Sequence, residues 1–330
     1  MTLYLPSESF AYEQLRLKSL DVRTDDEAPH GTIETLFVNP MFFPRSAEVD
    51  WFEHFARSKH NVRVTLVIPD AYVDSDYFKE LSTDDAAYVK ATYIPWLALK
   101  RTFRQDRLDF DGALFAGAGF ECTPFEDLPT YDSFVKMFEW SYVHSASTLF
   151  SCYLANVAYS HFYGIKAQQR GEKLFDVYSQ QLLANPRFPI SRRLCEKLKT
   201  LTPLEMPASR LLFREPSQLS ADTDIVLSSF EAGATLFVTH RGDEKSGKEM
   251  IFLEDHPESA RVLLDVYNHC NARYLAQKTN RKPRRLPTRQ VIPANGGAPE
   301  APWLPIGQTI VDTWLERLFE ARLAKLQLAA

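Results

Sequence analysis

The chain has 330 residues, 45% of them hydrophobic, and a formal net charge of −5. This size and apolar content allow a large buried core and predict one principal domain with elaborations. The charge leaves no global basic field for nucleic acid or an anionic membrane, and no apolar run approaches the roughly 18 residues of a spanning helix. Four cysteines without CxxC spacing, and an N-terminus without a signal-peptide layout, indicate a reducing cytoplasm.

The first half of the chain alternates short apolar runs with helical patterns. Residues 1–34 are mixed and charged, and they are expected to form an N-terminal arm before the first strand. Strands are predicted from β-rich runs at residues 35–39, 62–68, 112–115 and 148–150. The segment 47–58 carries apolar residues near helical spacing. Continuous apolar strands separated by helices are typical of a mostly parallel sheet that is covered on both faces.

The second half begins with a predicted helix that ends at Gly164, the residue type preferred just past a helix end. Further strands are predicted at residues 224–231, 234–242 and 249–258. Residues 279–305 hold prolines, paired glycines and many cations, which indicates a long loop, a kind of segment that is often functional. Amphipathic spacing predicts a closing helix over residues 308–327.

Cys152 is the first candidate for chemistry, because the strand-like STLFS runs directly into it and a helical pattern follows. A side chain at such a tight turn stands above the sheet edge, where the helix N-terminus lowers the pKa of a thiol. The backbone N–H of Tyr153 can then join an oxyanion hole. The alternative interpretation is a small buried hydrophobe, which is the commoner role of a lone cysteine.

His256 and Glu258 form the second candidate, in EDHPES at the end of the apolar run EMIFL. At a strand end, such a pair can place an imidazole beside a thiol and a carboxylate behind the imidazole. A solvated pair of loop residues is the alternative. No metal site and no bound cofactor are expected.

The segment FEWSYVHSASTLFSCYLANVAYSHFYGI resembles the homoserine O-succinyltransferase/O-acetyltransferase family around its catalytic cysteine. LFVNPM, DGALFAGAGFECTPFEDL, RGEKLFDVY, PASR and EDHPE resemble that family in the same order along the chain. The resemblance implies a flavodoxin-like, doubly wound, mostly parallel sheet like that of class I glutamine amidotransferases. It implies a single catalytic domain over residues 35–330, usually homodimeric, with Cys152 as nucleophile, His256 as general base and Glu258 orienting the imidazole.

The activity that this resemblance implies is transfer of an acyl group from an acyl-CoA co-substrate, through a thioester on Cys152, to a hydroxyl group. Homoserine would be the acceptor, and the enzyme would belong to methionine biosynthesis. Two alternatives stay open. The same residues can serve a hydrolase or amidotransferase with water or ammonia as acceptor, or a relative that keeps the fold and only binds a ligand.

Glu121 in AGAGFEC stands at the position that resembles the family's acyl-selecting site, where glycine accompanies succinyl transfer and glutamate accompanies acetyl transfer. A succinyl carboxylate about 4 Å from an ionised Glu121 would meet a repulsion of roughly 4 kcal/mol at an effective dielectric near 20. The predicted donor is therefore acetyl-CoA rather than succinyl-CoA. The alternative is that Glu121 is an exposed loop acid.

The oxyanion hole and the acceptor site depart from the family pattern. The family's lysine pair is replaced here by Phe43 and Pro44, so either the adjacent Arg45 helps to hold the oxyanion, or backbone amides, with Ala118 and Tyr153 as candidates, do so alone. The family's amino-acid-reading glutamate and arginine correspond to Tyr267 and Cys270. Neither side chain supplies the charge that a desolvated ammonium and carboxylate need, which puts homoserine in doubt as the acceptor.

Several charged residues offer further contacts with the substrates. Arg273 or Asp265 can read the acceptor in a shifted pose, and serine or another alcohol is an alternative acceptor. By resemblance, Lys173, Ser209 and Arg210 are expected in the substrate site. A basic run can neutralise the phosphates of CoA or can be a solvated loop; it comprises Lys278, Arg281, Lys282, Arg284, Arg285 and Arg289.

Overall fold

The structure is a computed structural model that describes most of the chain. The described residues are 1–102, 110–118, 120, 124–183, 185–241, 248–261, 263–264, 266, 268 and 301–329. Within these ranges, no helix combines the length and the apolarity needed to cross a bilayer. Glu121, Tyr267, Cys270, Arg273 and residues 278–300 lie outside the described residues.

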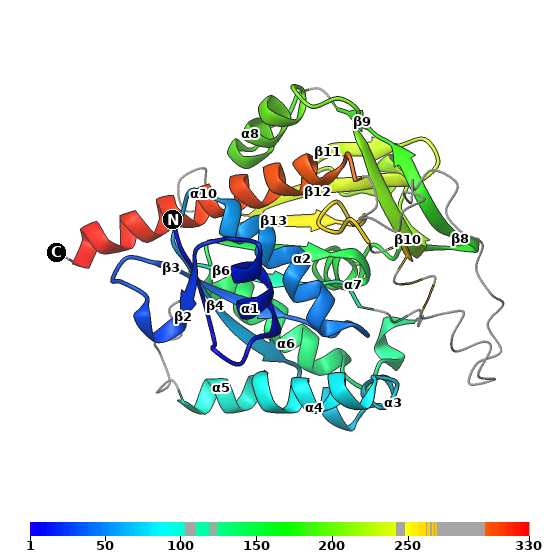
Figure 1. Cartoon of the computed structure of the whole chain (residues 1–330). Coiled ribbons are helices and arrows are strands. Elements are labelled where there is room, and N and C mark those ends of the chain that lie inside the picture. Colours follow the sequence, from blue (N-terminus) through cyan, green and yellow to red (C-terminus); the bar gives the residue numbers. More distant parts are fainter. Residues whose placement is uncertain are drawn as a thin grey trace, which may run out of the picture.

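A large sheet runs through the described part of the chain (Figure 1). Its strands are β1 (Leu3–Leu5), β2 (Val22–Thr24), β3 (Ile33–Val38), β4 (Val62–Ile68), β5 (Ile94–Pro95), β6 (Gly112–Phe115), β7 (Ser147–Ser151), β9 (Gln181–Leu182), β11 (Thr223–Ser229), β12 (Gly233–Arg241) and β13 (Lys248–Leu253). The strand order is β2-β1-β4-β3-β6-β7-β13-β12-β11-β9, with β5 paired to β4. All pairs from β2 to β13 are parallel, whereas β12, β11 and β9 continue the sheet antiparallel.

Helices cover both faces of this sheet (Figure 1). They are α1 (Phe10–Leu17), α2 (Pro44–Arg57), α3 (Asp76–Lys79), α4 (Thr83–Thr92), α5 (Trp96–Thr102), α6 (Tyr131–His144), α7 (Cys152–Tyr163), α8 (Pro189–Leu198) and α10 (Leu304–Ala329), with short 3₁₀ turns at Asp25–Glu27, Tyr72–Asp74, Phe125–Asp127 and Pro216–Gln218. Gly164 caps α7 with φ 69°, as its sequence position predicted.

The alternation of side chains along the strands assigns these helices to opposite faces. Phe37 of β3 is in register with Leu114 of β6, so the next residue, Phe115, points to the other face. The Phe37 ring packs on Phe52 of α2 with centroids 4.7 Å apart, and the Phe115 ring packs on Phe138 of α6 at 5.0 Å. The predicted α/β class with a doubly wound, mostly parallel sheet is confirmed.

A separate two-stranded antiparallel sheet stands beside the main one (Figure 1). It pairs β8 (Gln168–Ser179) with β10 (Glu205–Phe213). The two sheets are linked through the main chain, because the His256 N–H donates to the Pro207 carbonyl at 2.8 Å. Residues 1–34, expected as an arm, contribute β1 and β2 to the edge of the large sheet, and β1 pairs in parallel with both β2 and β4.

Candidate active site

Three adjacent parallel strands end together and assemble the site. The last residue of β7, Ser151, is in register with Leu253 of β13, and Phe150 is in register with Phe115 of β6. The residues that directly follow these strands therefore meet at one edge of the sheet, which is where ligands bind in open α/β folds. Cys152 follows β7, the loop containing His256 follows β13, and Gly117 follows β6.

Cys152 occupies a sharp strand-to-helix turn. It has φ of 51°, a left-handed conformation that costs a non-glycine residue free energy, and α7 begins at the same residue. The side chain is buried. This is the geometry of a nucleophile elbow, in which the strained turn lifts the reactive atom above the sheet edge and presents it to the first free N–H groups of the helix.

Gly117 allows the main chain to pass close to Cys152 and His256. A Cβ atom built at Gly117 would lie 3.1 Å from the Cβ of Cys152, 3.3 Å from Cε1 of His256 and 3.4 Å from the sulfur of Met41. The first two distances are tighter than ordinary van der Waals contact. These contacts show that Cys152 and His256 approach the same point, and that this point leaves no room for a side chain.

His256 bridges Cys152 and Glu258. Its Nδ1 lies 2.7 Å from Oε1 of Glu258, and its ring also hydrogen bonds with Cys152. Burial acts to lower the pKa of His256, but the negative charges and hydrogen bonds of Cys152 and Glu258 outweigh it and raise the pKa well above its ordinary value. Within the described residues, Oε2 of Glu258 is buried without a hydrogen-bond partner. The three side chains form a chain of proton donors and acceptors.

A buried cluster of charges holds the loop before His256. Arg210 of β10 donates from Nε to Asp255 at 2.9 Å and from Nη1 to Glu254 at 2.7 Å, and Arg214 donates to the other oxygen of Glu254 at 2.9 Å. Arg214 also donates to Asn156, whose side chain donates to the Cys152 carbonyl at 3.2 Å. The cluster therefore joins the loop that carries His256 to the helix that carries Cys152.

Arg210 was expected in the substrate site, and its guanidinium is directed into this buried cluster. Besides the two carboxylates it donates to the carbonyls of Leu212 and Ala232, at 2.8 and 2.7 Å. Burial raises the pKa of Asp255 to about 6, although Arg210 acts in the opposite direction. Ser209 is buried on the same strand opposite Phe175 of β8, and Lys173 is half-buried on β8.

The helices α2 and α10 support the loop from its other side. Nε2 of His54 lies 3.1 Å from the Glu258 carbonyl oxygen, and Nδ1 of His54 lies 3.0 Å from Gln308 of α10. The Trp303 indole donates to the Ser259 carbonyl at 2.9 Å. A Cβ built at Gly307 would meet the Pro257 carbonyl oxygen at 2.5 Å, so the helix approaches the loop too closely for any other residue type.

The three predicted oxyanion residues lie on three different segments: Tyr153 on α7, Ala118 after β6 and Arg45 on α2. Tyr153 is the second residue of α7, and its ring is held edge-on by Phe120 and Phe125, each with centroids 5.6 Å away. Ala118 is buried in the segment after β6. Arg45 donates to Asp85 at 2.6 Å and lies over the Phe10 ring.

Sequence reasoning missed the supporting residues of the site. Two signals that were not used could have pointed to part of them: the glycines of AGAG to a close backbone approach at Gly117, and the acidic pair Glu254 and Asp255 to cationic partners nearby. His54, Arg214 and Gln308 left no comparable local signal. Within the described residues, no group of three or more His, Cys, Asp or Glu side chains is placed to hold a metal ion.

The chain is similar to a family of known enzymes over almost its whole length. A family model for homoserine O-succinyltransferase matches residues 2–320. The homoserine O-succinyltransferase of Edwardsiella ictaluri is 29% identical over 319 residues, covering 96% of this chain and 94% of the relative. The homoserine O-acetyltransferase of Lachnoclostridium phytofermentans is 26% identical over 268 residues, covering 80% of this chain and 81% of the relative.

Among solved structures, a glutamine amidotransferase from Thermotoga maritima aligns with a TM-score of 0.48 at 13% identity, covering 88% of this chain and all of the other. The sequence comparisons define the class of the protein, which is an acyltransferase enzyme. Within that class, the chain belongs to the homoserine O-succinyltransferase family.

Proposed function

We propose that the protein transfers an acetyl group from acetyl-CoA to the hydroxyl of homoserine or a related hydroxy amino acid such as serine, through a thioester on Cys152. The observation that carries this proposal is the alignment of Cys152, His256 and Glu258 at the carboxyl edge of β7 and β13, with a 2.7 Å contact between His256 and Glu258. Membership of a family of homoserine acyltransferases supports the substrate class.

In the first step, His256 takes the proton of the Cys152 thiol and the sulfur attacks the thioester carbonyl of the acyl-CoA. The carbonyl oxygen becomes an oxyanion, which N–H groups at the start of α7 can stabilise. The C–S bond to CoA then breaks, and the imidazolium of His256 returns the proton to the departing thiolate. Glu258 stabilises the imidazolium while the proton resides on it.

In the second step, the acceptor hydroxyl transfers its proton to His256 as its oxygen attacks the acyl group on Cys152. The C–S bond to Cys152 breaks, the ester leaves, and the proton from His256 restores the thiol. The thioester formed in the first step is nearly as reactive as the thioester consumed. A cysteine therefore suits an acyl-CoA donor, and ping-pong kinetics are expected.

The backbone amides of Tyr153 and Ala118 are the proposed oxyanion hole. Arg45 is the alternative donor, but its 2.6 Å bond to Asp85 ties it to α4. This pairing supports the version in which amides act alone. Tyr153 supports it as well, since an N–H in the first turn of a helix has no partner within that helix and carries the positive end of the helix dipole.

The choice of acetyl over succinyl rests on Glu121, through the repulsion that a succinyl carboxylate would meet there. A homoserine O-succinyltransferase is 27% identical to this chain and a homoserine O-acetyltransferase is 26% identical. Sequence identity therefore does not select the donor. The acceptor is proposed as a small hydroxy amino acid rather than homoserine alone, because Tyr267 and Cys270 replace the charged readers of the family.

Intact mass spectrometry of the protein mixed with acetyl-CoA or succinyl-CoA tests the covalent route. We expect a gain of about 42 daltons with acetyl-CoA, removed by Cys152→Ala. Cys195→Ala is the matched control, since Cys195 is also a buried free cysteine but lies on α8, and this variant should still be acylated. Absence of an adduct with both donors in the wild type would defeat the proposal.

Donor and acceptor are then tested separately. Glu121→Gly should admit succinyl-CoA, and an unchanged donor preference would remove the role assigned to Glu121. Release of CoA should depend on an added hydroxy amino acid, which a screen over homoserine, serine and other alcohols identifies. Rapid hydrolysis of acetyl-CoA without any acceptor would instead show a thioester hydrolase.

A further inference from the structure

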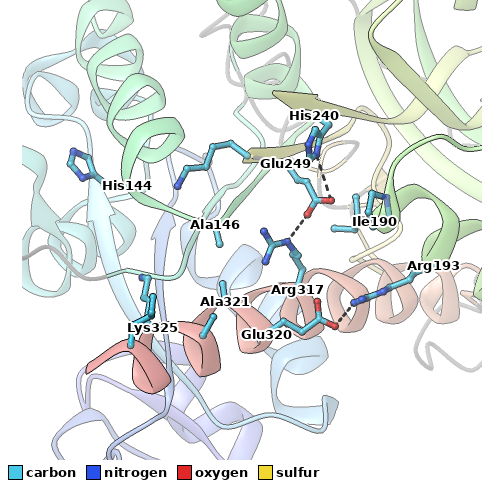
Figure 2. A pocket seen from close by; sticks show the side chains of 14 residues that line it. His144, Ala146, Ile190, Arg193, His240, Glu249, Arg317, Glu320, Ala321 and Lys325 are labelled. Atoms are coloured by element: carbon cyan, nitrogen blue, oxygen red, sulfur yellow. Dashed lines mark hydrogen bonds and ion pairs between the residues drawn. The ribbon is translucent and has the colours of Figure 1, made fainter. Parts of the chain in front are cut away.

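A cavity of about 520 Å³ lies at the amino ends of β7 and β13, far along these strands from Cys152. Its walls come from the start of both strands, the end of α6, α8 and α10 (Figure 2). Lys248 is the first residue of β13, whereas His256 follows the other end of that strand. With about 3.3 Å per residue, the six residues of β13 span roughly 20 Å. The cavity is therefore separate from the catalytic edge.

Cations outnumber carboxylates in the wall of this cavity. Among the described residues, four cationic side chains line it, against two carboxylates, Glu249 and Glu320. Each carboxylate already has a partner: Arg317 donates to Glu249 at 2.7 Å, and Arg193 lies 2.7 Å from Glu320 (Figure 2). The other two cations are Lys248 and Lys325, and Lys325 shares the carboxylate of Asp111, behind the wall, with Arg322. With this second layer included, the described residues place five cations against three carboxylates, a surplus of two positive charges in a protein whose net charge is −5.

The positive charges in the wall lie close enough to repel one another. Burial lowers the pKa of the Lys248 ammonium, and the positive charges of Lys325 and Arg317 lower it further. Burial also lowers the pKa of His144, which faces the positive charges of Lys248 and Lys100. Lys248 donates to the Ser145 carbonyl at 2.8 Å, and Lys325 lies 3.1 Å from Asp111, which is completely buried behind the wall. An anion in the cavity would relieve the mutual repulsion of these cations.

Two imidazoles, those of His144 and His240, also line the cavity, and the remaining described wall is apolar, with Ala146, Ile190 and Ala321 among its residues. The volume falls within the range of about 300–1,000 Å³ that is usual for small-molecule sites. Such sites combine apolar walls with a few charged groups that fix the orientation of the ligand. An occupant of matching chemistry carries a compact doubly charged group and a short apolar portion.

We propose that this cavity is a binding site for a small organic dianion, with a phosphate monoester or dicarboxylate head held by Lys248, Lys325 and Arg317. Arginine and lysine are the side chains that bind such oxygens through charge-assisted hydrogen bonds. An occupant would contact the first residues of β13, the strand that leads to His256. The site goes beyond the transfer reaction proposed above and does not depend on it.

Isothermal titration calorimetry of the full chain with phenyl phosphate and with malonate, at constant ionic strength, tests the proposal. At least one probe should bind with one-to-one stoichiometry, and benzyl alcohol, which lacks the charge, should not. The probe that binds more tightly identifies the head group. Lys248→Met should weaken binding about tenfold or more, because a hydrogen bond to a charged group contributes about 1.5–3 kcal/mol.

Lys199→Met is the matched control, because Lys199 is an exposed lysine just past α8 and outside the cavity. It should leave the affinity unchanged. Lys325→Gln, at a lysine whose side chain is 39% exposed, provides a second cavity variant if Lys248→Met does not fold. Equal losses in Lys248→Met and Lys199→Met would show general charge screening. The proposal would be overturned by any of three results: equal losses in these two variants, unchanged affinity in both cavity variants, or no binding of either probe to the wild type.

Repeating the titration with saturating CoA separates this cavity from any phosphate contacts at the acyl-CoA site. Binding in the cavity should persist when CoA is present. Loss of all probe binding on addition of CoA would place the probe at the acyl-CoA site and would also overturn the proposal.

Discussion

Nε2 of His54 lies 3.1 Å from the backbone carbonyl oxygen of Glu258, although the two residues are 204 positions apart in the chain. The same imidazole contacts Gln308, whose amide donates to the His54 carbonyl and to Asp312, each at 3.0 Å. His54 is buried, and burial lowers its pKa even though Gln308 and Glu258 act to raise it. The contact holds in place the main chain that carries the Glu258 side chain.

We therefore expect His54→Ala to lower kcat about tenfold to a hundredfold with a small change in KM, since a displacement of about 1 Å in a catalytic group has effects of this size. The alkylation rate of Cys152 as a function of pH should also shift, because Glu258 would no longer hold His256. His60→Ala is the matched control. His60 packs on Phe319 of the same helix α10, and its Nε2 has no hydrogen-bond partner among the described residues, so its variant should keep the wild-type profile. Identical profiles in all three proteins would contradict the positioning role.

Gly117→Ala should reduce activity strongly with little loss of stability. Its Cβ would stand 3.1 Å from the Cβ of Cys152 and 3.3 Å from Cε1 of His256, so the two side chains of the proposed mechanism must move by a few tenths of an ångström. We expect kcat/KM to fall about tenfold or more, measured alongside Tm. Gly171→Ala is the control, because a Cβ there meets no atom within 4 Å. Full activity in Gly117→Ala would show that the contact is not tight.

Arg210→Met should destabilise the fold and not only the site. The substitution leaves Glu254 and Asp255 buried with fewer cationic partners, and breaking a buried ion pair in this way costs about 3–5 kcal/mol. Urea unfolding at neutral pH measures the free energy of unfolding. Arg170→Met, at a half-buried arginine of β8 that donates to the Glu231 carbonyl and lies over the Phe213 ring, should cost about 1 kcal/mol or less, because no buried carboxylate loses its partner. Similar values for both variants would argue against the cluster as a stabilising element.

Glu48 should make stability depend on pH near neutrality. Burial raises its pKa to about 7, although hydrogen bonds donated by Tyr93, Tyr88 and Ser9 act to lower it. Because the folded-state pKa is raised, the folded state holds a proton that the unfolded state loses. Stability therefore falls as pH rises from about 4.5 to about 7, by roughly 3 kcal/mol from this group, and then levels off.

Glu48→Gln should remove that decline, and urea unfolding between pH 5 and pH 8 measures it. Glu53, on the same helix, is the control, because its pKa is shifted in the opposite direction to that of Glu48. Partial burial acts to raise its pKa, but Lys18 and Arg57 outweigh this and lower it, so the contribution of Glu53 is present above its unfolded pKa and lost as pH falls. Glu53→Gln should leave the decline toward pH 7 intact. A wild-type slope that persists in Glu48→Gln would assign the decline to other groups.

The sequence by itself determined the features that depend on neighbouring residues. Apolar runs located β3, β4, β6, β7, β11, β12 and β13, because a strand that is buried on both faces is a nearly continuous hydrophobic segment. Direct passage from strand to helix indicated the turn at Cys152, and position at a strand end indicated His256. These features follow from local periodicity and from the rule that carboxyl ends of parallel strands meet.

Only the tertiary structure decided what holds these residues in place. Three features depend on which distant surfaces meet. They are the sheet of β8 and β10, the burial of Arg210 against Glu254 and Asp255, and the pairing of Arg45 with Asp85. The contact between His54 and Gln308 joins residues 254 positions apart. Local spacing carries no information about such pairs, because desolvation and the packing of whole elements select the partner of a buried polar group.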